Sequence, residues 1–225
     1  MSILTTMQTP RMSIEDDLLI LAQWLSPAYP LGAFAWSQGL EMAIADGHVT
    51  DAATLRDWIT DTLEHGAGRS DAILIRLGHA VDATDLADLN DTALAFAPSE
   101  ERRAEITRQG AAFCKTTAAT SKIELPELVL PVALGRAARL ARVNIDLTAA
   151  LYLQSQVSNL VSAAQRLMAL GQTEAQGVVA DLRPLCRVIA EATRGTTEDD
   201  LYSAAFMADI ASMRHETLQP RLFQS

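Results

Sequence analysis

The stretch LTAALYLQSQVSNLVSAAQRLMALG, residues 147–171, is the most informative segment for the fold. At 100° per residue its apolar side chains share one broad face of a helix: Leu153, Val157, Leu160, Ala164 and Leu167, with Val161 and Met168 at the edge. The opposite stripe is polar and uncharged until Arg166: Thr148, Ser155, Asn159 and Ser162. A surface helix normally carries Glu and Lys on its outer face. The pattern therefore predicts a buried central helix, Leu147–Leu170, covered almost all round by other helices.

The composition of the chain fits one soluble domain. Its 225 residues are 49% hydrophobic and carry a formal net charge of −10, which disfavours binding to nucleic acid and to anionic lipid. Six polar side chains between residues 154 and 162 argue against a membrane span, and the first residues lack the pattern of a secretory signal. Cys114 and Cys186 are typical of buried thiols in a reducing compartment. We expect a cytoplasmic protein.

Capping residues, prolines and glycines divide the remaining chain into helices, and no stretch alternates with the period of two expected of strands. Three predicted boundaries depend on one residue each. Pro126 begins a helix, Pro184 bends or restarts the chain, and Thr197 caps a last helix that ends at about Met213. The sequence predicts an all-α, single-domain bundle of about ten helices. Its three parts are a mobile N-terminal tail (1–12), a helical domain (13–213) and a C-terminal docking tail (214–225).

A search for catalytic chemistry yields no candidate. The four histidines are scattered without metal-ligand spacing, and there is no Cys-x-x-Cys pair. The chain has no phosphate-binding GxxxxGK[ST] loop and no nucleophile elbow, and its carboxylates are spread along solvated faces and helix starts. The sequence predicts no catalytic residue and no metal ligand.

The loop from Pro27 to Glu41 carries the first group of candidate partner-binding residues. Its prolines and glycines forbid a continuous helix and fix a shape that presents aromatic side chains. A hydrophobic linker folded over the core explains the same composition. The partner-binding residues predicted in this loop are Tyr29, Pro30, Gly32, Phe34, Trp36, Ser37, Gln38, Gly39 and Glu41.

The C-terminal segment 214–225 carries the second group. A frayed chain end is the ordinary interpretation of such a tail. However, Leu222 and Phe223 beside Arg221 are typical of a docking peptide that becomes ordered on binding. The partner-binding residues predicted here are Arg214, His215, Glu216, Arg221, Leu222 and Phe223.

Five blocks of sequence, in this order, resemble the UreF family of urease accessory proteins. They are PLGAFAWSQGLE (30–41), PVALG (131–135), LVSAAQRLMALGQ (160–172), DIASMRHE (209–216) and RLFQS (221–225). Together they are specific, and the resemblance spans residues 17–225. The acidic region 83–106 is the least typical part of the chain.

The resemblance implies an all-helical, non-catalytic maturation factor for the nickel enzyme urease. Members of the family are homodimers that bind UreD (also called UreH) and recruit the GTPase UreG, and the assembly delivers nickel to apo-urease. The chain would then need no cofactor of its own, because its partners handle nickel and GTP. The segment 214–225 matches the part that orders against UreD, and the loop 30–41 would face UreG or the second protomer. If the chain accelerates GTP hydrolysis by UreG, Arg136, Arg139 and Arg166 are available, but the sequence selects none of them.

Two other classes of function remain open at this point. One is a small helical cytoplasmic enzyme whose site is built from scattered carboxylates and His215. The other is a generic helical dimerisation module unrelated to metal delivery. The first predicts turnover of a small substrate by the isolated chain, and the second predicts no co-purification with UreD and UreG.

Overall fold

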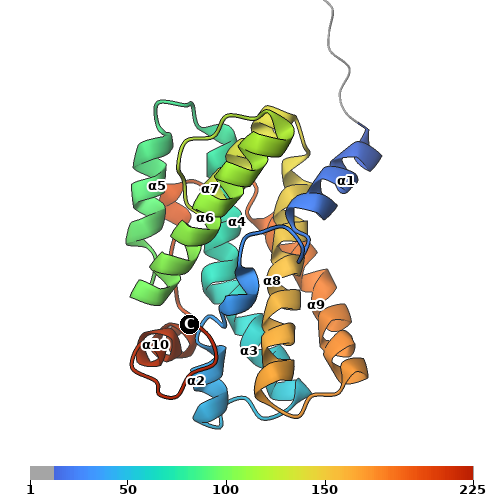
Figure 1. Cartoon of the computed structure of the whole chain (residues 1–225), viewed down its shortest axis with the longest axis vertical. Helices are drawn as coiled ribbons and strands as arrows, with labels where there is room; N and C mark the ends of the chain where they lie inside the picture. The colour runs from blue at the N-terminus through green and yellow to red at the C-terminus, as the bar shows by residue number, and fades with distance from the viewer. Residues whose placement is uncertain (1–12, 225) are drawn as a thin grey trace, which may run out of the picture.

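The computed structural model describes residues 13–224, so the predicted N-terminal tail (1–12) and Ser225 lie outside the described residues. Within residues 13–224 the chain forms ten α-helices and two 3-10 helices and no strand, which confirms the all-α fold (Figure 1). The elements are α1 (Ile14–Trp24), η1 (Ala33–Ala35), α2 (Leu40–Ala45), α3 (Ala52–His65), α4 (Ala67–Ala80), α5 (Leu86–Ala95), α6 (Glu100–Ser121), α7 (Leu130–Ala141), α8 (Ile145–Leu167), α9 (Gln172–Ala192), η2 (Glu198–Asp200) and α10 (Phe206–His215).

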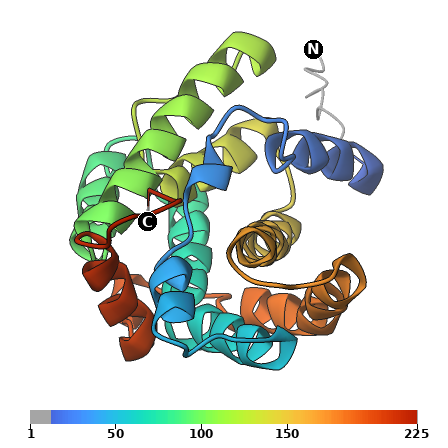
Figure 2. The same ribbon diagram turned by 60° about the horizontal axis from the view of Figure 1, so that its bottom comes forward.

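Helix α8 is the predicted central helix, shifted slightly toward the N-terminus. It begins at Ile145 because the Asn144 side chain caps it, accepting a hydrogen bond from the Leu147 N–H at 3.0 Å. It packs against α9, α4, α2, α7 and α3, and Figure 2 shows several of these helices around it. Only Ser158 and Arg166 are exposed along its length. The expectation of a central helix is confirmed in outline, because other helices cover most of it, although two open grooves run along residues 144–159.

Two hydrophobic clusters form the core. One lies among α1, α4, α5, α6 and α7, and the other among α2, α3, α8 and α9. The crossing of α4 and α7 is especially close because glycines face the partner backbone at two positions. A Cβ at Gly135 would lie 2.0 Å from the Ile75 carbonyl oxygen, and one at Gly78 would lie 2.6 Å from that of Val132. Only glycine fits these two positions at this separation.

Three predicted boundaries need correction, the one at Pro184 only in that the helix does not restart there, and tertiary contacts explain the first. Pro126 does not begin α7, which starts at Leu130 with Pro131 in its first turn. Residues 128–130 instead cross α6 so tightly that a Cβ at Gly110 would lie 2.1 Å from the Leu128 carbonyl oxygen. The Val129 N–H, which precedes the helix, donates to Asn90 Oδ1 at 2.8 Å.

The other two boundaries lie near the C-terminus. Helix α9 continues through Pro184, which lies on its exposed side, where the backbone carbonyl that loses its N–H partner can face water. Thr197 caps only the short η2, and α10 begins nine residues later at Phe206. Among residues 13–224, no helix combines the length and apolar character needed to cross a membrane.

Candidate interaction surface

The loop between α1 and α2 crosses the faces of α6 and α8 (Figure 2). Tyr29 and Trp36 are buried, and the Tyr29 hydroxyl lies 2.8 Å from Thr117 Oγ1 of α6. Phe34 is 44% exposed, and Pro30 and Gly32 are exposed as well. Two of the three predicted aromatic anchors therefore fix the loop to its own bundle. Partner contact by the outward-facing residues stays a prediction.

The end of the loop depends on glycine. Gly39 has a φ of 80°, and a Cβ at this position would lie 2.7 Å from the backbone nitrogen of Ser212 in α10. The neighbouring Ser37 is buried, and its hydroxyl accepts a hydrogen bond from the Glu41 N–H at 3.3 Å. These contacts place α2 directly against α10, although about 170 residues of chain separate them.

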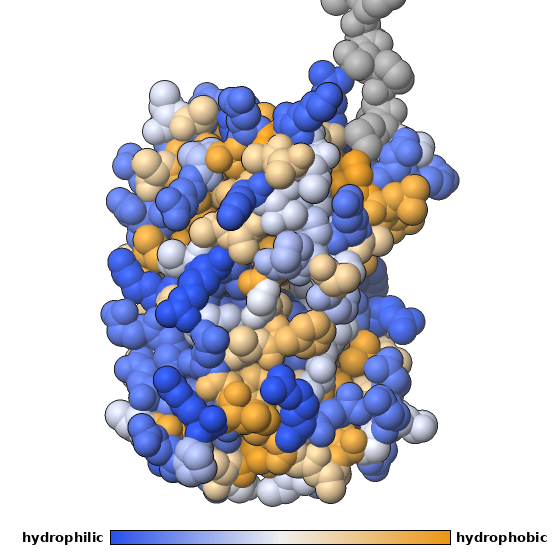
Figure 3. Space-filling model, in the orientation of Figure 1, coloured by the Kyte–Doolittle hydropathy of each residue, from blue (hydrophilic) through white to orange (hydrophobic). Residues whose placement is uncertain are grey.

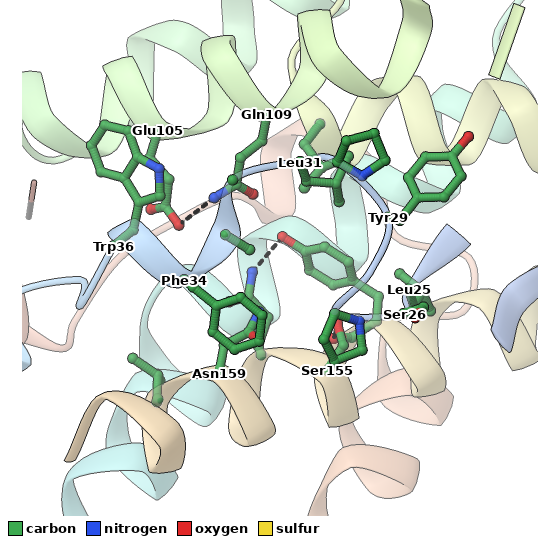
Figure 4. Close-up of a pocket in the computed structure, with 18 of the residues that line it drawn as sticks. Leu25, Ser26, Tyr29, Leu31, Phe34, Trp36, Glu105, Gln109, Ser155 and Asn159 are labelled. Carbon is green, nitrogen blue, oxygen red and sulfur yellow. Dashed lines mark hydrogen bonds between the residues drawn. The ribbon is translucent and has the colours of Figure 1, made fainter. Parts of the chain in front are cut away.

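A polar network lies beneath the loop, beside a cavity of about 180 Å³. Figure 4 shows Glu105 and Gln109 of α6 on one side of this cavity and Ser155 and Asn159 of α8 on the other. Gln38 joins the two helices, because its Nε2 donates to Glu105 Oε1 at 3.1 Å and to Gln156 Oε1 at 3.0 Å. The predicted partner residue Gln38 is thus part of the chain's own packing.

The network continues inward to a buried ion pair. The Arg102 guanidinium contacts both Asp71 and Glu105, and the Tyr152 hydroxyl donates to Asp71. Burial raises the pKa of Asp71, and the positive charge of Arg102 opposes that rise. No sequence pattern indicated this cluster, because Arg102 and Glu105 belong to a charged run typical of a solvated helix start.

The imidazole of His215, at the end of α10, is fully buried at 0% exposure. Its Nδ1 lies 2.8 Å from Glu101 Oε2 of α6, and its Nε2 lies 3.0 Å from Glu41 Oε2 of α2. The same two carboxylates hold the segment that follows. The backbone N–H groups of Leu222 and Phe223 donate to Glu41 at 2.6 and 2.9 Å, and Arg221 pairs with Glu101.

The environment of Glu41 favours its charged form. Burial alone would raise the pKa of this carboxyl, but the hydrogen bond with His215 and those from the Leu222 and Phe223 amides outweigh burial. They hold the pKa below its ordinary value of 4.5. Glu41 was predicted to contact a partner. Its side chain instead joins α2, α10 and the C-terminal segment of the same chain, and a contact with a partner remains unobserved.

The C-terminal segment reaches the loop, so the two predicted partner-binding segments lie side by side. The Gln224 N–H donates to the Ala35 carbonyl at 2.7 Å. Arg166 of α8 links both segments, because its guanidinium lies 4.4 Å from the Phe223 ring centroid and donates to the Phe34 carbonyl at 3.0 Å. Figure 1 shows the C-terminus beside α10 and the loop.

The residues of this segment differ in exposure. His215 and Phe223 are buried within the chain, whereas Arg214, Glu216, Arg221 and Leu222 are exposed. Arg214 pairs with Asp46 of α2, and Glu216 accepts a hydrogen bond from the Glu100 N–H at 3.0 Å. We name the surface formed by the loop 27–39, α2, α10 and residues 216–224 the composite surface. Its role in partner binding stays a prediction.

The three arginines considered for action on a GTPase all contact their own chain. Arg139 donates to the Ala80 carbonyl at 2.9 Å and Arg136 donates to the Val81 carbonyl at 3.5 Å, at the end of α4. Arg166 holds the loop and Phe223, as described above. Among residues 13–224, no group of three or more His, Cys, Asp or Glu side chains is arranged to hold a metal ion.

Fold and surface together define an all-helical single-domain protein whose C-terminal segment closes over its first loop. The chain belongs to the UreF family: the UreF family model matches residues 49–183. Urease accessory protein UreF of Ruegeria pomeroyi is 48% identical over 212 residues, covering 94% of this chain and 98% of that protein. The proteins of the same name from Ruegeria sp. strain TM1040 and Roseobacter denitrificans are 54% and 44% identical, with 93% and 98% of this chain and 99% and 100% of theirs covered. The resemblance inferred from the sequence blocks is confirmed.

Proposed function

We propose that this chain is a urease maturation factor that binds UreD and, with it, recruits and regulates UreG for nickel insertion into apo-urease. Membership of the UreF family supports the link to urease. The single structural observation that carries the proposal is the composite surface, in which two segments far apart in the sequence are joined through Glu41. A surface assembled in this way suits recognition by a folded protein partner better than it suits chemistry on a small molecule.

Helix α10 supplies the apolar part of the UreD contact. Phe206, Ile210 and Met213 share one face of α10, and Phe206 is 69% exposed. In the C-terminal segment, Leu222 is a further exposed apolar side chain, at 55% exposure. Contiguous apolar surface of this kind is typical of protein–protein contacts. UreD therefore docks on α10 and residues 216–224, and the loop around Phe34 is left to contact UreG.

A second apolar face supports a homodimer. Helix α1 exposes Ile14, Leu18 and Leu19. Figure 3 shows apolar surface at the position that α1 occupies in Figure 1. Two open grooves lie beside α1: one of about 500 Å³ along α8 and α9, and one of about 560 Å³ between α1 and α8. Gln154, which lines both grooves, has a buried side-chain oxygen without a hydrogen-bond partner among the described residues. A second copy packed on this face would cover the apolar surface and supply a donor to that oxygen.

The partners handle nickel and GTP in this proposal, and the chain acts by holding one conformation of UreG and preventing premature turnover. A gating role of this kind needs no arginine inserted into the UreG site. The proposed function requires a location in the cytoplasm. The two cysteines, both free and buried, are compatible with such a reducing compartment.

Co-purification tests the proposal. Ile210→Asp places a charge in the centre of the α10 face, and we expect it to abolish retention of UreD and hence of UreG. Val188→Asp, which changes an exposed apolar side chain of α9, is the matched control and should retain both partners. Deletion of residues 217–225 leaves the buried His215 in place, so it tests the segment without opening the bundle. Full retention of UreD by both the Ile210 variant and the deletion would refute the assignment of this surface.

A further inference from the structure

His215 holds the C-terminal segment in a geometry that depends on the protonation of its ring. Its two nitrogens lie 2.8 and 3.0 Å from carboxylate oxygens of Glu101 and Glu41. Both carboxylates also hold residues of the segment. We propose that His215 is a pH-sensitive latch, which docks residues 216–224 on α2 and α6 when its imidazole is protonated and releases them when it is neutral.

The number of hydrogen-bond donors on the His215 ring differs between its two protonation states. A carboxylate only accepts hydrogen bonds, so each ring nitrogen of His215 must donate to satisfy the observed contacts. The imidazolium donates from both nitrogens, whereas a neutral imidazole donates from one. In the neutral ring, the lone pair of the other nitrogen would face a carboxylate oxygen without water between them, because the ring is fully buried.

The charges of the cluster lead to the same conclusion. Glu41 and Glu101 contribute two negative charges, and Arg221 together with a protonated His215 contributes two positive charges. Loss of the ring proton leaves a net negative charge in a buried site, which is unfavourable.

The neighbouring charged groups already have partners of their own. On α2, Asp46 pairs with Arg214, which precedes His215 in α10. On α6, the Glu100 N–H donates to the carboxylate of Glu216, which follows His215. The groups that face the ring itself are the carboxylates of Glu41 and Glu101, and Arg221 pairs with Glu101. The latch therefore responds to the ring proton of His215 and to the charges of these three residues.

The direction of the pH dependence follows from linkage. The docked segment favours the protonated ring, so docking and protonation strengthen each other. The docked fraction therefore falls as the pH rises and the ring loses its proton. On the acid side docking persists to below pH 4.5, because the pKa of Glu41 is lowered.

Hydrogen exchange of the isolated full chain tests the latch without any partner. The readout is the protection factor of the Leu222 and Phe223 amides, corrected for the intrinsic exchange rate, between pH 5.5 and 8.5. Loss of one charge-assisted hydrogen bond predicts a fall of about tenfold or more across this range. His215→Gln should show low protection with no such fall, and His48→Gln, a variant of an exposed histidine, should behave as the unaltered chain. A pH-independent protection factor in the unaltered chain, or an equal fall in His215→Gln, would overturn the proposal.

A second measurement needs no variant of His215. Nitrogen-15 NMR of the histidine rings at pH 6 reports whether one or both ring nitrogens of His215 carry a proton while the segment is docked. Two protonated nitrogens are expected, and a single one would overturn the latch. The consequence for recruitment rests on the proposed function. If exchange shows the latch but UreD binds equally well at pH 5.5 and 8.5, the proposed role of the segment fails and the latch stands.

Discussion

Phe223 and Leu222 are adjacent in sequence, but the structure gives them opposite roles. Phe223 is 4% exposed, packs in the α2, α3, α8 and α9 cluster and lies under the Arg166 guanidinium, whereas Leu222 is 55% exposed. We predict that Phe223→Ala detaches residues 216–224 from the bundle. Leu222→Ala should leave them docked and should weaken only the contact with UreD.

The magnitude follows from the burial of the ring. Truncating a buried Phe to Ala costs about 3–5 kcal/mol, and loss of the Arg166–ring contact adds about 0.5–2 kcal/mol. A loss of about 3 kcal/mol lowers the docking equilibrium constant of the segment by about 100-fold. Because a terminal segment can detach, the loss of global stability is limited to the docking free energy. Leu222→Ala should change stability by less than about 0.5 kcal/mol.

Hydrogen exchange measures this difference directly. The reporter is the Gln224 amide, which donates to the Ala35 carbonyl in the docked state. Phe223→Ala should lower its protection factor by about 100-fold, or to the level of an unstructured chain if that is reached first. Leu222→Ala should leave it within about twofold, a change that corresponds to less than 0.5 kcal/mol. Equal protection in both variants would refute the assignment of Phe223 as the anchor of the segment.

Three further predictions concern the bundle and the buried charges. Gly135→Ala should lower the free energy of unfolding, measured in urea, by about 3 kcal/mol or more, because its Cβ would meet the Ile75 carbonyl at 2.0 Å. The control Gly177→Ala has open space at the Cβ position and should instead stabilise the fold by about 0.5–1 kcal/mol. Equal effects of the two substitutions would contradict the close crossing of α4 and α7. Arg102→Met should destabilise by about 3–5 kcal/mol at neutral pH, since it leaves buried carboxylates without a cation. Burial already raises the pKa of Asp71, so this carboxylate takes up a proton readily as the pH falls. Urea unfolding should therefore show that the destabilisation by Arg102→Met shrinks at lower pH. A destabilisation that does not change with pH would count against the buried ion pair. Finally, the Leu222 amide should stay protected from hydrogen exchange at pH 4.5 and lose this protection at lower pH, because the stabilisation by Glu41 is lost only as the pH falls through its lowered pKa. Loss of protection well above pH 4.5 would contradict the assigned role of Glu41.

The fold was predictable from the sequence because local patterns decided it. The polar stripe of α8 carries no charge before Arg166, and this feature alone indicated a covered helix. Local caps decide several helix starts, because the side chains of Ser13, Asp51 and Ser99 each accept a backbone hydrogen bond in the structure. The start of α7 failed because the chain at residues 128–130 is held extended by contacts with α6, which no local signal encodes.

The composite surface was predictable only in part. The loop and the C-terminal segment were both identified as unusual, but nothing in the sequence indicated that they touch. Their contact depends on Glu41 and Glu101. Glu101 lies in a charged run typical of a solvated helix start, and Glu41 was expected to face a partner and not the chain's own C-terminal segment. Burial of a charged side chain is decided by elements distant in the sequence, so the roles of His215 and Phe223 within the chain became apparent only in three dimensions.

Activation of apo-urease in a reconstituted mixture with UreD, UreG, nickel and GTP tests the central claim most directly, namely that the docked C-terminal segment completes the surface through which this chain acts. We predict full activation with the unaltered chain, little with Phe223→Ala, and none above background when the chain is omitted. Full activation by Phe223→Ala under conditions in which hydrogen exchange shows its segment detached, or full activation without the chain, would contradict the account.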